Sequence, residues 1–222
     1  QAVIATRDFK EAKYLAFATR KGQVKKTEFL EYNTPIKADG IIAINIKDDD
    51  ELVAVRTTTG NDDIIMVSKS GQAVRFKEEE ARPMGRSTGG VRGMNVSREI
   101  AKGEPNEVIA MEVASDECDL LVVTQGGYGK RTAMTEYPVK GRGVGCFELG
   151  GQGDELLFMS QGGMVQRTSA SEISQYKRAS QGVRVMNIKD DDQVSAVAPV
   201  MEGSSEDKVV DAAGEQAADG EP

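Results

Sequence analysis

The sequence contains no histidine and no tryptophan, and only two cysteines among its 222 residues. Without histidine, the chain cannot form a serine–histidine–aspartate triad, a cysteine–histidine pair or a histidine-ligated zinc site. Cys118 and Cys146 lie far apart and show no Cys-x-x-Cys spacing, which argues against a disulfide framework and a cysteine-ligated zinc. We therefore expect no catalytic residue, no metal ligand and no cofactor in this chain, and the cysteine usage fits a reducing cytoplasm.

Long apolar runs are missing as well. No stretch approaches the ~20 residues that a membrane-spanning helix needs, and no signal peptide opens the chain. The hydrophobic content of 39% is nevertheless enough to bury a sizeable core. These features predict a soluble, cytoplasmic protein without a membrane partner.

The chain lacks a positive net charge, because 36 acids outnumber 28 bases and leave a net charge of −8. Residues 202–222 hold seven acids and one base, so this segment alone carries −6 and leaves −2 for the rest of the chain. Its Gly-, Ser-, Ala- and acid-rich composition predicts disorder. The body of the protein is close to neutral, and the positions of its bases decide what it can bind.

Glycine, by contrast, is abundant, with 24 residues, and it marks a repeat. A hairpin pattern occurs four times, each a short apolar strand, a polar pair ending in glycine, and a strand that carries bases. The four copies span residues 14–27, 64–76, 120–132 and 156–168. Lys-Gly, Ser-Gly and Gly-Gly pairs supply the positive φ that tight hairpin turns require.

A second pattern, led by glycine, follows in three copies at 40–45, 90–95 and 182–187. A turn, acidic in the first and last copies, and a final apolar strand come after it, so a complete unit holds about four short strands. That content is typical of one propeller blade of ~40–50 residues. The third unit is shorter, with 36 positions from Gly127 to Gly163 against 49 and 56 between the earlier turn glycines, and lacks one strand and its turn.

The repeats therefore predict an all-β, propeller-like fold of four-stranded blades with a disordered acidic C-terminal tail. Residues 1–13 read as the last strand of a preceding blade, which indicates that the chain is a fragment. The predicted domain layout places four blades at about 14–59, 60–114, 115–152 and 153–200, followed by the tail at 201–222.

The repeats resemble the β-pinwheel of the C-terminal domain of the A chain of DNA gyrases, in register from about Tyr14 to Val200. The most specific stretches are Gly-Gly-Tyr-Gly-Lys-Arg-Thr at 126–132, Glu-Tyr-Pro at 136–138, Arg-Pro-Met-Gly-Arg at 82–86, Gly-Val-Arg-Gly-Met at 90–94 and Gln-Gly-Val-Arg at 181–184. The resemblance covers roughly the last four of six blades. The family's wrapping loop, which belongs to the first blade, is not found in this sequence.

The resemblance implies a non-catalytic domain of a type IIA topoisomerase that wraps duplex DNA and supports ATP-dependent negative supercoiling by the whole enzyme. The implied partners are double-stranded DNA, bound through its phosphates with little sequence preference, and the gyrase A core and gyrase B subunit of an A2B2 complex. The implied location is the bacterial cytoplasm, at the nucleoid.

The bases suggest the same ligand independently of the family. Lys26, Arg75, Arg131 and Arg167 each lie four positions after the turn glycine, so we expect them to recur at the edge of successive blades. Regularly spaced cations suit a curved polyanion. The predicted DNA-binding residues are Lys25, Lys26, Lys37, Arg75, Arg86, Arg92, Lys130, Arg131, Lys140, Arg142, Arg167, Lys177, Arg178 and Arg184.

Two alternatives remain open at this point. The C-terminal domain of the topoisomerase IV counterpart of gyrase A is a close relative that binds DNA but wraps it less. A protein-interaction propeller would expose an apolar or aromatic patch and no ordered basic ring. Aromatic residues make up only 5% of the chain, which argues against the interaction propeller.

Overall fold

The computed structural model describes residues 4, 6, 8–35, 37–47, 49–141, 155–189 and 191–200. Within these ranges all regular structure is β-strand or 3-10 helix, and the 3-10 helices are three or four residues long. The predicted all-β class is therefore confirmed. None of the helices in the described ranges is long and apolar enough to cross a membrane.

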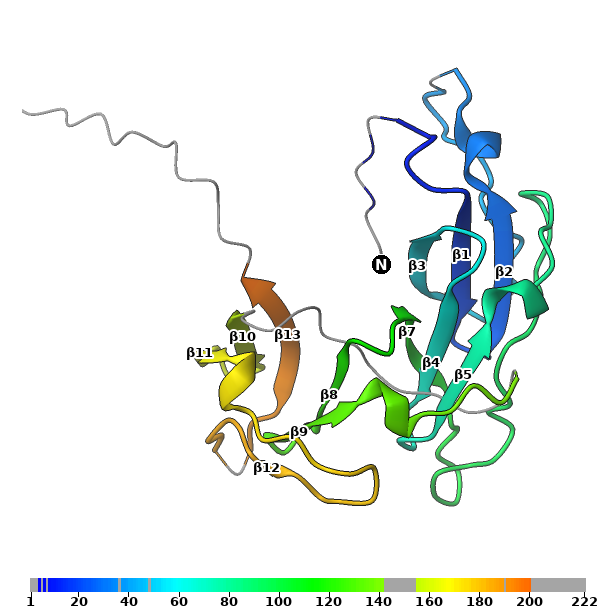
Figure 1. Ribbon diagram of the computed structural model, residues 1–222. Helices are drawn as coiled ribbons and strands as arrows, with labels where there is room; N and C mark the ends of the chain where they lie inside the picture. Colours follow the sequence, from blue (N-terminus) through cyan, green and yellow to red (C-terminus); the bar gives the residue numbers. More distant parts are fainter. Residues whose placement is uncertain are drawn as a thin grey trace, which may run out of the picture.

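Four small antiparallel sheets follow one another along the chain (Figure 1). Each is built on one of the predicted hairpins, namely β1 (Tyr14–Thr19) with β2 (Gln23–Glu28), β4 (Asp63–Ser68) with β5 (Ala73–Lys77), β8 (Asp119–Val123) with β9 (Tyr128–Ala133), and β10 (Glu155–Ser160) with β11 (Val165–Ser169). A third strand pairs with the first hairpin strand in three sheets, as β3 (Leu52–Thr58), β7 (Val108–Ala114) and β13 (Val194–Val200). Directly after the hairpins come the 3-10 helices η1 (Phe29–Tyr32), η2 (Glu78–Glu80), η3 (Met134–Glu136) and η4 (Ala170–Glu172).

The glycine-led pattern supplies strands that are exchanged between repeats. β6 (Val91–Arg92) belongs to the second repeat in sequence but pairs with β2 of the first, and β12 (Val183–Arg184) of the fourth repeat pairs with β9 of the third. Four strands therefore meet in the first sheet, as predicted for a blade, but the fourth strand comes from the following repeat. The prediction that each unit completes its own blade is wrong on this point.

Glycine is required where an exchanged strand begins. Gly90 and Gly182 have φ of +89° and +85°, a region that other residues seldom adopt. A Cβ at Gly90 would lie 2.5 Å from the carbonyl oxygen of Val24, and one at Gly182 would lie 2.6 Å from that of Gly129. Only a residue without a side chain lets the incoming backbone approach the neighbouring sheet this closely.

The hydrophobic core is divided into layers between consecutive sheets. All six residues of β4 are buried, and because alternate residues of a strand face opposite sides, Ile64 packs toward the first sheet and Ile65 toward the third. Leu121 and Phe158 belong to the layer between the third and fourth sheets. Each repeat is therefore stabilised mainly by its neighbours, as in other repeat proteins.

The acidic turns cap the hairpin turns. Asp50 accepts hydrogen bonds from the Thr19 hydroxyl at 2.6 Å and the Lys21 amide at 2.8 Å, and Asp192 accepts one from the Gly162 amide at 2.7 Å. In the second repeat Asn106 takes the same place and accepts from the Ser70 amide. The last member of each acidic triplet thus has a structural role in its own repeat.

Candidate nucleic-acid interface

The cations that recur on the second hairpin strand lie between repeats. Lys26 is buried, and its Nζ donates to the carbonyl oxygen of Glu78 at 2.9 Å and lies 3.4 Å from the carboxylate of the same residue. That carboxylate is itself fully buried, and it also accepts hydrogen bonds from the Thr58 hydroxyl and from the amides of Gly60 and Asp62. Lys26 therefore joins the first repeat to the second.

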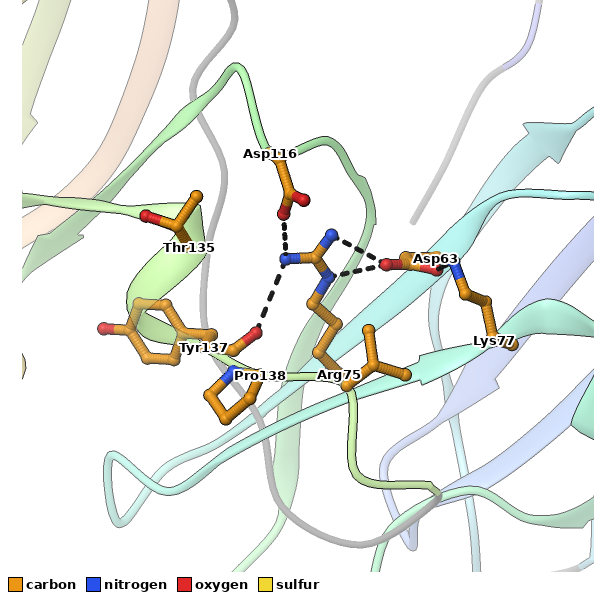
Figure 2. A pocket seen from close by; sticks show the side chains of 8 residues that line it. Asp63, Arg75, Lys77, Asp116, Thr135, Tyr137 and Pro138 are labelled. Carbon is orange, nitrogen blue, oxygen red and sulfur yellow. Dashed lines mark hydrogen bonds and ion pairs between the residues drawn. The ribbon is translucent and has the colours of Figure 1, made fainter.

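Arg75 makes the corresponding connection from the second repeat to the third (Figure 2). Its Nε lies 2.7 Å from Asp63 Oδ2 within the same sheet, and its Nη1 lies 2.6 Å from Asp116 Oδ1. The same nitrogen donates to the carbonyl oxygens of Met134 at 3.2 Å and Tyr137 at 3.4 Å. Arg75, Asp63, Asp116 and Tyr137 line a cavity of about 260 Å³, and every nitrogen of the Arg75 guanidinium already has a partner from the protein.

Arg131 repeats this arrangement between the third and fourth repeats. Its Nη1 lies 2.9 Å from Asp119 Oδ2, and its Nε donates to the carbonyl oxygen of Ile173 at 2.6 Å. Asp119 begins its hairpin as Asp63 does, and Ile173 follows its 3-10 helix as Tyr137 does. We call the contacts made by Lys26, Arg75 and Arg131 the inter-repeat joints.

The positions of the joint cations contradict one expectation from the sequence. Lys26, Arg75 and Arg131 were expected at the edge of the blades, but Lys26 and Arg75 are buried and Arg131 is half-buried, because carbonyls and acids of the same and the next repeat surround them. Of the four recurring cations, only Arg167, on β11, is exposed.

Lys25 and Lys130 are also inside the protein rather than at its surface. Lys25 Nζ donates to the carbonyl oxygens of Ala43 and Arg86, both at 2.6 Å, and burial lowers the pKa of Lys25 to about 8. Lys130 Nζ donates to three carbonyl oxygens, those of Lys177 at 3.0 Å, Arg178 at 2.6 Å and Ser180 at 2.8 Å. A position of these two ammonium groups at the surface is therefore wrong, because backbone carbonyl groups of the protein surround them.

The remaining predicted residues lie at the surface of loops and exchanged strands. Those that are exposed or half-exposed are Lys37, Arg86, Arg92, Lys140, Lys177, Arg178 and Arg184. Arg142 lies outside the described residues. Three of these seven, Arg86, Lys177 and Arg178, lie on the stretches that connect a 3-10 helix to an exchanged strand, residues 82–89 and 174–181, which we call the connecting loops.

The two connecting loops, and the stretch that follows η3, leave their sheets at equivalent points. The amides of Met84, Lys140 and Tyr176 donate to the carbonyl oxygens of the three joint cations Lys26, Arg75 and Arg131. Two positions further along the sequence stands an arginine in every case, at 86, 142 and 178. Arg86 precedes Gly90 by four residues, and Arg178 precedes Gly182 by four. This shared spacing is the sequence signal that could have identified the two arginines as equivalent.

Aromatic rings support two of the exposed arginines. The guanidinium carbon of Arg178 lies 5.0 Å from the ring centroid of Tyr137, and its Nη1 donates to the Glu136 carbonyl oxygen at 3.3 Å. Arg184 lies 5.2 Å from the ring centroid of Tyr128 and donates to its hydroxyl at 3.0 Å. Such contacts orient a guanidinium while leaving it accessible to solvent.

Parts of three repeats meet beside Arg178. A cavity of about 650 Å³ is lined by the hairpin turn 71–73, by Glu136 and Tyr137, and by Lys177 and Arg178. The bases of the fourth repeat thus face the turn of the second across the third. Within the described ranges, no group of three or more Cys, Asp or Glu residues is placed to hold a metal ion.

The known proteins that resemble this chain agree on a family. The family model described as "DNA gyrase C-terminal domain, beta-propeller" matches residues 13–59, 62–114, 119–145 and 154–201. The gyrase A protein of Mycobacterium tuberculosis (strain ATCC 25618 / H37Rv) is 37% identical over 230 residues, which cover 96% of this chain and 26% of that protein. The gyrase A protein of Staphylococcus epidermidis (strain ATCC 12228 / FDA PCI 1200) is 38% identical over 218 residues, covering 90% and 24%.

Solved structures give the same fold. The C-terminal domain of a DNA topoisomerase IV matches with a TM-score of 0.77 and 26% identity, over 89% of this chain and 64% of that one. A DNA gyrase A C-terminal domain matches with a TM-score of 0.73 and 23% identity, over 88% and 68%. The chain spans about a quarter of the length of the sequence relatives given above. The matched segments run through all four repeats, and the chain belongs to the family of DNA gyrase C-terminal domains with the beta-propeller fold.

Proposed function

We propose that this chain binds the phosphate backbone of duplex DNA through the exposed bases of its connecting loops and exchanged strands. The observation that carries the proposal is their recurrence in register. Arg86 and Arg178 occupy the same position of two connecting loops, and Arg92 and Arg184 the same position of two exchanged strands. Repeating cations along a series of sheets match a polyanion whose charges also repeat.

The proposed binding has little sequence preference. Lysine and arginine on exposed loops suit phosphate oxygens, and contacts to phosphate fix position without reading bases. The tyrosines near these bases, Tyr128 and Tyr137, lie within 5.2 Å and 5.0 Å of arginine groups rather than forming an open stacking platform. Duplex DNA is therefore a better fit than a single strand.

We further propose that the chain acts as the DNA-wrapping part of a gyrase A protein. In that role it performs no chemistry and holds no cofactor, and it works in the bacterial cytoplasm with the gyrase A core and gyrase B subunit in an A2B2 complex. DNA bent around this domain would bias strand passage toward ATP-dependent negative supercoiling by the whole type IIA topoisomerase. Family membership and the recurring exposed arginines support this role.

Ligation of nicked circular DNA in the presence of the purified chain tests the proposal. Wrapping shifts the closed circles toward positive linking numbers. Binding without such a shift would instead favour a domain that wraps DNA less, such as that of topoisomerase IV. No binding to duplex DNA at low salt would overturn the proposal in favour of a protein-interaction propeller.

A further inference from the structure

We propose that Lys25 and Lys130 are positioning residues for DNA binding, although neither reaches the surface. The ammonium group of each holds the backbone of the next repeat's connecting loop, and thereby fixes the exposed arginine that the loop carries. This inference rests on the proposed function, because it takes the connecting loops as the part that contacts phosphate.

The contact recurs in two separate places. Lys25 and Lys130 each lie three positions after a turn glycine, on β2 and β9. Their Nζ atoms donate to the carbonyl oxygens of Arg86 and Arg178, both at 2.6 Å. These two arginines occupy the same loop position, four residues before the glycine that starts the exchanged strand. A contact repeated between equivalent residues of two repeat pairs belongs to the repeat itself rather than to one local packing arrangement.

The backbone of the fourth repeat's connecting loop surrounds the ammonium group of Lys130. Its three hydrogen-bond donors meet three carbonyl oxygens, those of Lys177, Arg178 and Ser180, within 3.0 Å. An ammonium group has only three donors, so the set is complete. Removing it would leave three carbonyl groups beside a hydrocarbon, and burying a polar group without a partner is costly. The loop would then have to move its backbone toward water.

The ends of the same loop are fixed separately. At its start, the amide of Tyr176 donates to the carbonyl oxygen of Arg131 at 2.7 Å. At its end, a Cβ on Gly182 would lie 2.6 Å from the carbonyl oxygen of Gly129, so the backbone there packs directly against the backbone of β9. Lys130 therefore controls the middle of the loop, where Lys177 and Arg178 are exposed, while the ends have contacts of their own.

Not every repeat uses a lysine at this position. Val74 stands there in the second repeat and Gln166 in the fourth, where the side-chain amide donates to the carbonyl oxygen of Val185 at 2.9 Å. The fold therefore does not need an ammonium in every repeat. This favours a role linked to the connecting loops that follow the first and third repeats.

The experiment compares three variants of the whole chain, Lys130→Met, the double variant Lys177→Ala/Arg178→Ala, and all three changes together. Hydrogen exchange of the Tyr176 and Ser180 amides follows the loop, and exchange of the β4 amides reports on the fold elsewhere. Duplex affinity is measured over a series of salt concentrations. Lys69→Ala, which removes an exposed lysine paired with Glu104 at 3.1 Å, is the matched control for charge.

We expect Lys130→Met to speed exchange at Ser180 while leaving β4 protected. Its loss of affinity should equal that of the double variant within about twofold, and the triple variant should be no weaker than the double variant by more than the same factor. The slope of log K against log salt is negative, and each lost phosphate contact should make it flatter by ~0.9. If the losses of affinity from Lys130→Met and from the double variant do not add in the triple variant, Lys130 acts through the loop.

Three different outcomes would contradict the proposed function or the positioning role. If the double variant binds DNA as tightly as the unchanged chain, the proposed function fails. If the double variant is weakened but Lys130→Met binds normally with a loosened loop, the positioning role alone is wrong. If Lys130→Met and the milder Lys130→Gln both lose protection throughout β4, Lys130 is a residue of the fold only, and the positioning role is again overturned.

Discussion

Arg75 lies 2.7 Å from the carboxylate of Asp63 in its own sheet and donates to the carbonyl oxygen of Tyr137 in the next repeat at 3.4 Å. Arg131 does the same with Asp119 and Ile173. A base that recurs in the sequence therefore connects one repeat to the next in this fold. The proposed contacts to DNA are made instead by the bases that recur beside it on the connecting loops.

The first prediction concerns the joints. Replacing Arg75 with Met should lower the free energy of unfolding by at most about 3–5 kcal/mol, because Asp63 stays buried and keeps only Lys77, 2.6 Å away, as a charged partner. Denaturant unfolding followed by circular dichroism measures the change. Lys69→Ala, which breaks an exposed ion pair with Glu104, should change the stability by no more than about 1 kcal/mol. Equal, small effects of both substitutions would show that the joint does not stabilise the fold.

The second prediction concerns the glycine that starts an exchanged strand. Gly182 and Gly163 have nearly the same φ, +85° and +84°, but a Cβ would lie 2.6 Å from a carbonyl oxygen at Gly182 and would meet nothing within 4 Å at Gly163. Gly163→Ala should therefore cost only the ~1–2 kcal/mol of a left-handed conformation. Gly182→Ala should cost clearly more and should loosen the pairing of β12 with β9. Thermal unfolding and amide exchange at Val185 measure the difference, and equal costs would rule out the close approach.

The third prediction concerns pH. Burial lowers the pKa of Lys25 from 10.5 to about 8, with Glu31 raising it in part and Arg86 lowering it further. Between these pKa values the unfolded chain binds a proton that the native protein does not, so the free energy of unfolding should rise as the pH increases from about 8 toward 10. The full difference corresponds to at most about 3 kcal/mol, and screening by solvent lowers the part that is measured.

Lys25→Met provides the comparison for this pH dependence. Tyr32 donates its hydroxyl to the carbonyl oxygen of Ala43, which Lys25 also contacts, and burial raises the pKa of Tyr32. Tyr32 therefore opposes the rise above about pH 10, where its unfolded form loses a proton first. Unfolding should be measured below that pH in both proteins. Parallel curves for the two proteins would contradict the assignment to Lys25.

Much of the fold follows from local patterns in the sequence. The four hairpins, the turn glycines and the all-β class could be predicted, because apolar runs next to Lys-Gly, Ser-Gly or Gly-Gly leave few other structures. The pairing of β6 and β12 with the preceding repeat could not be predicted, because a two-residue strand has the same sequence pattern whichever sheet it joins. The carbonyl partners of Arg75 are 59 and 62 residues away, those of Lys130 are 47–50 residues away, and no local signal shows that carbonyl groups surround these side chains.

Two double variants test the central claim most directly, namely that duplex DNA is held by the connecting loops rather than by the recurring strand cations. One is Arg86→Ala/Arg178→Ala, and the other is Arg75→Met/Arg131→Met, measured at a temperature where both remain folded. We predict that the loop variant flattens the slope of log K against log salt by ~1.8, as expected for two lost phosphate contacts, while the joint variant keeps the slope of the unchanged chain. A flattened slope in the joint variant together with an unchanged slope in the loop variant would contradict the claim.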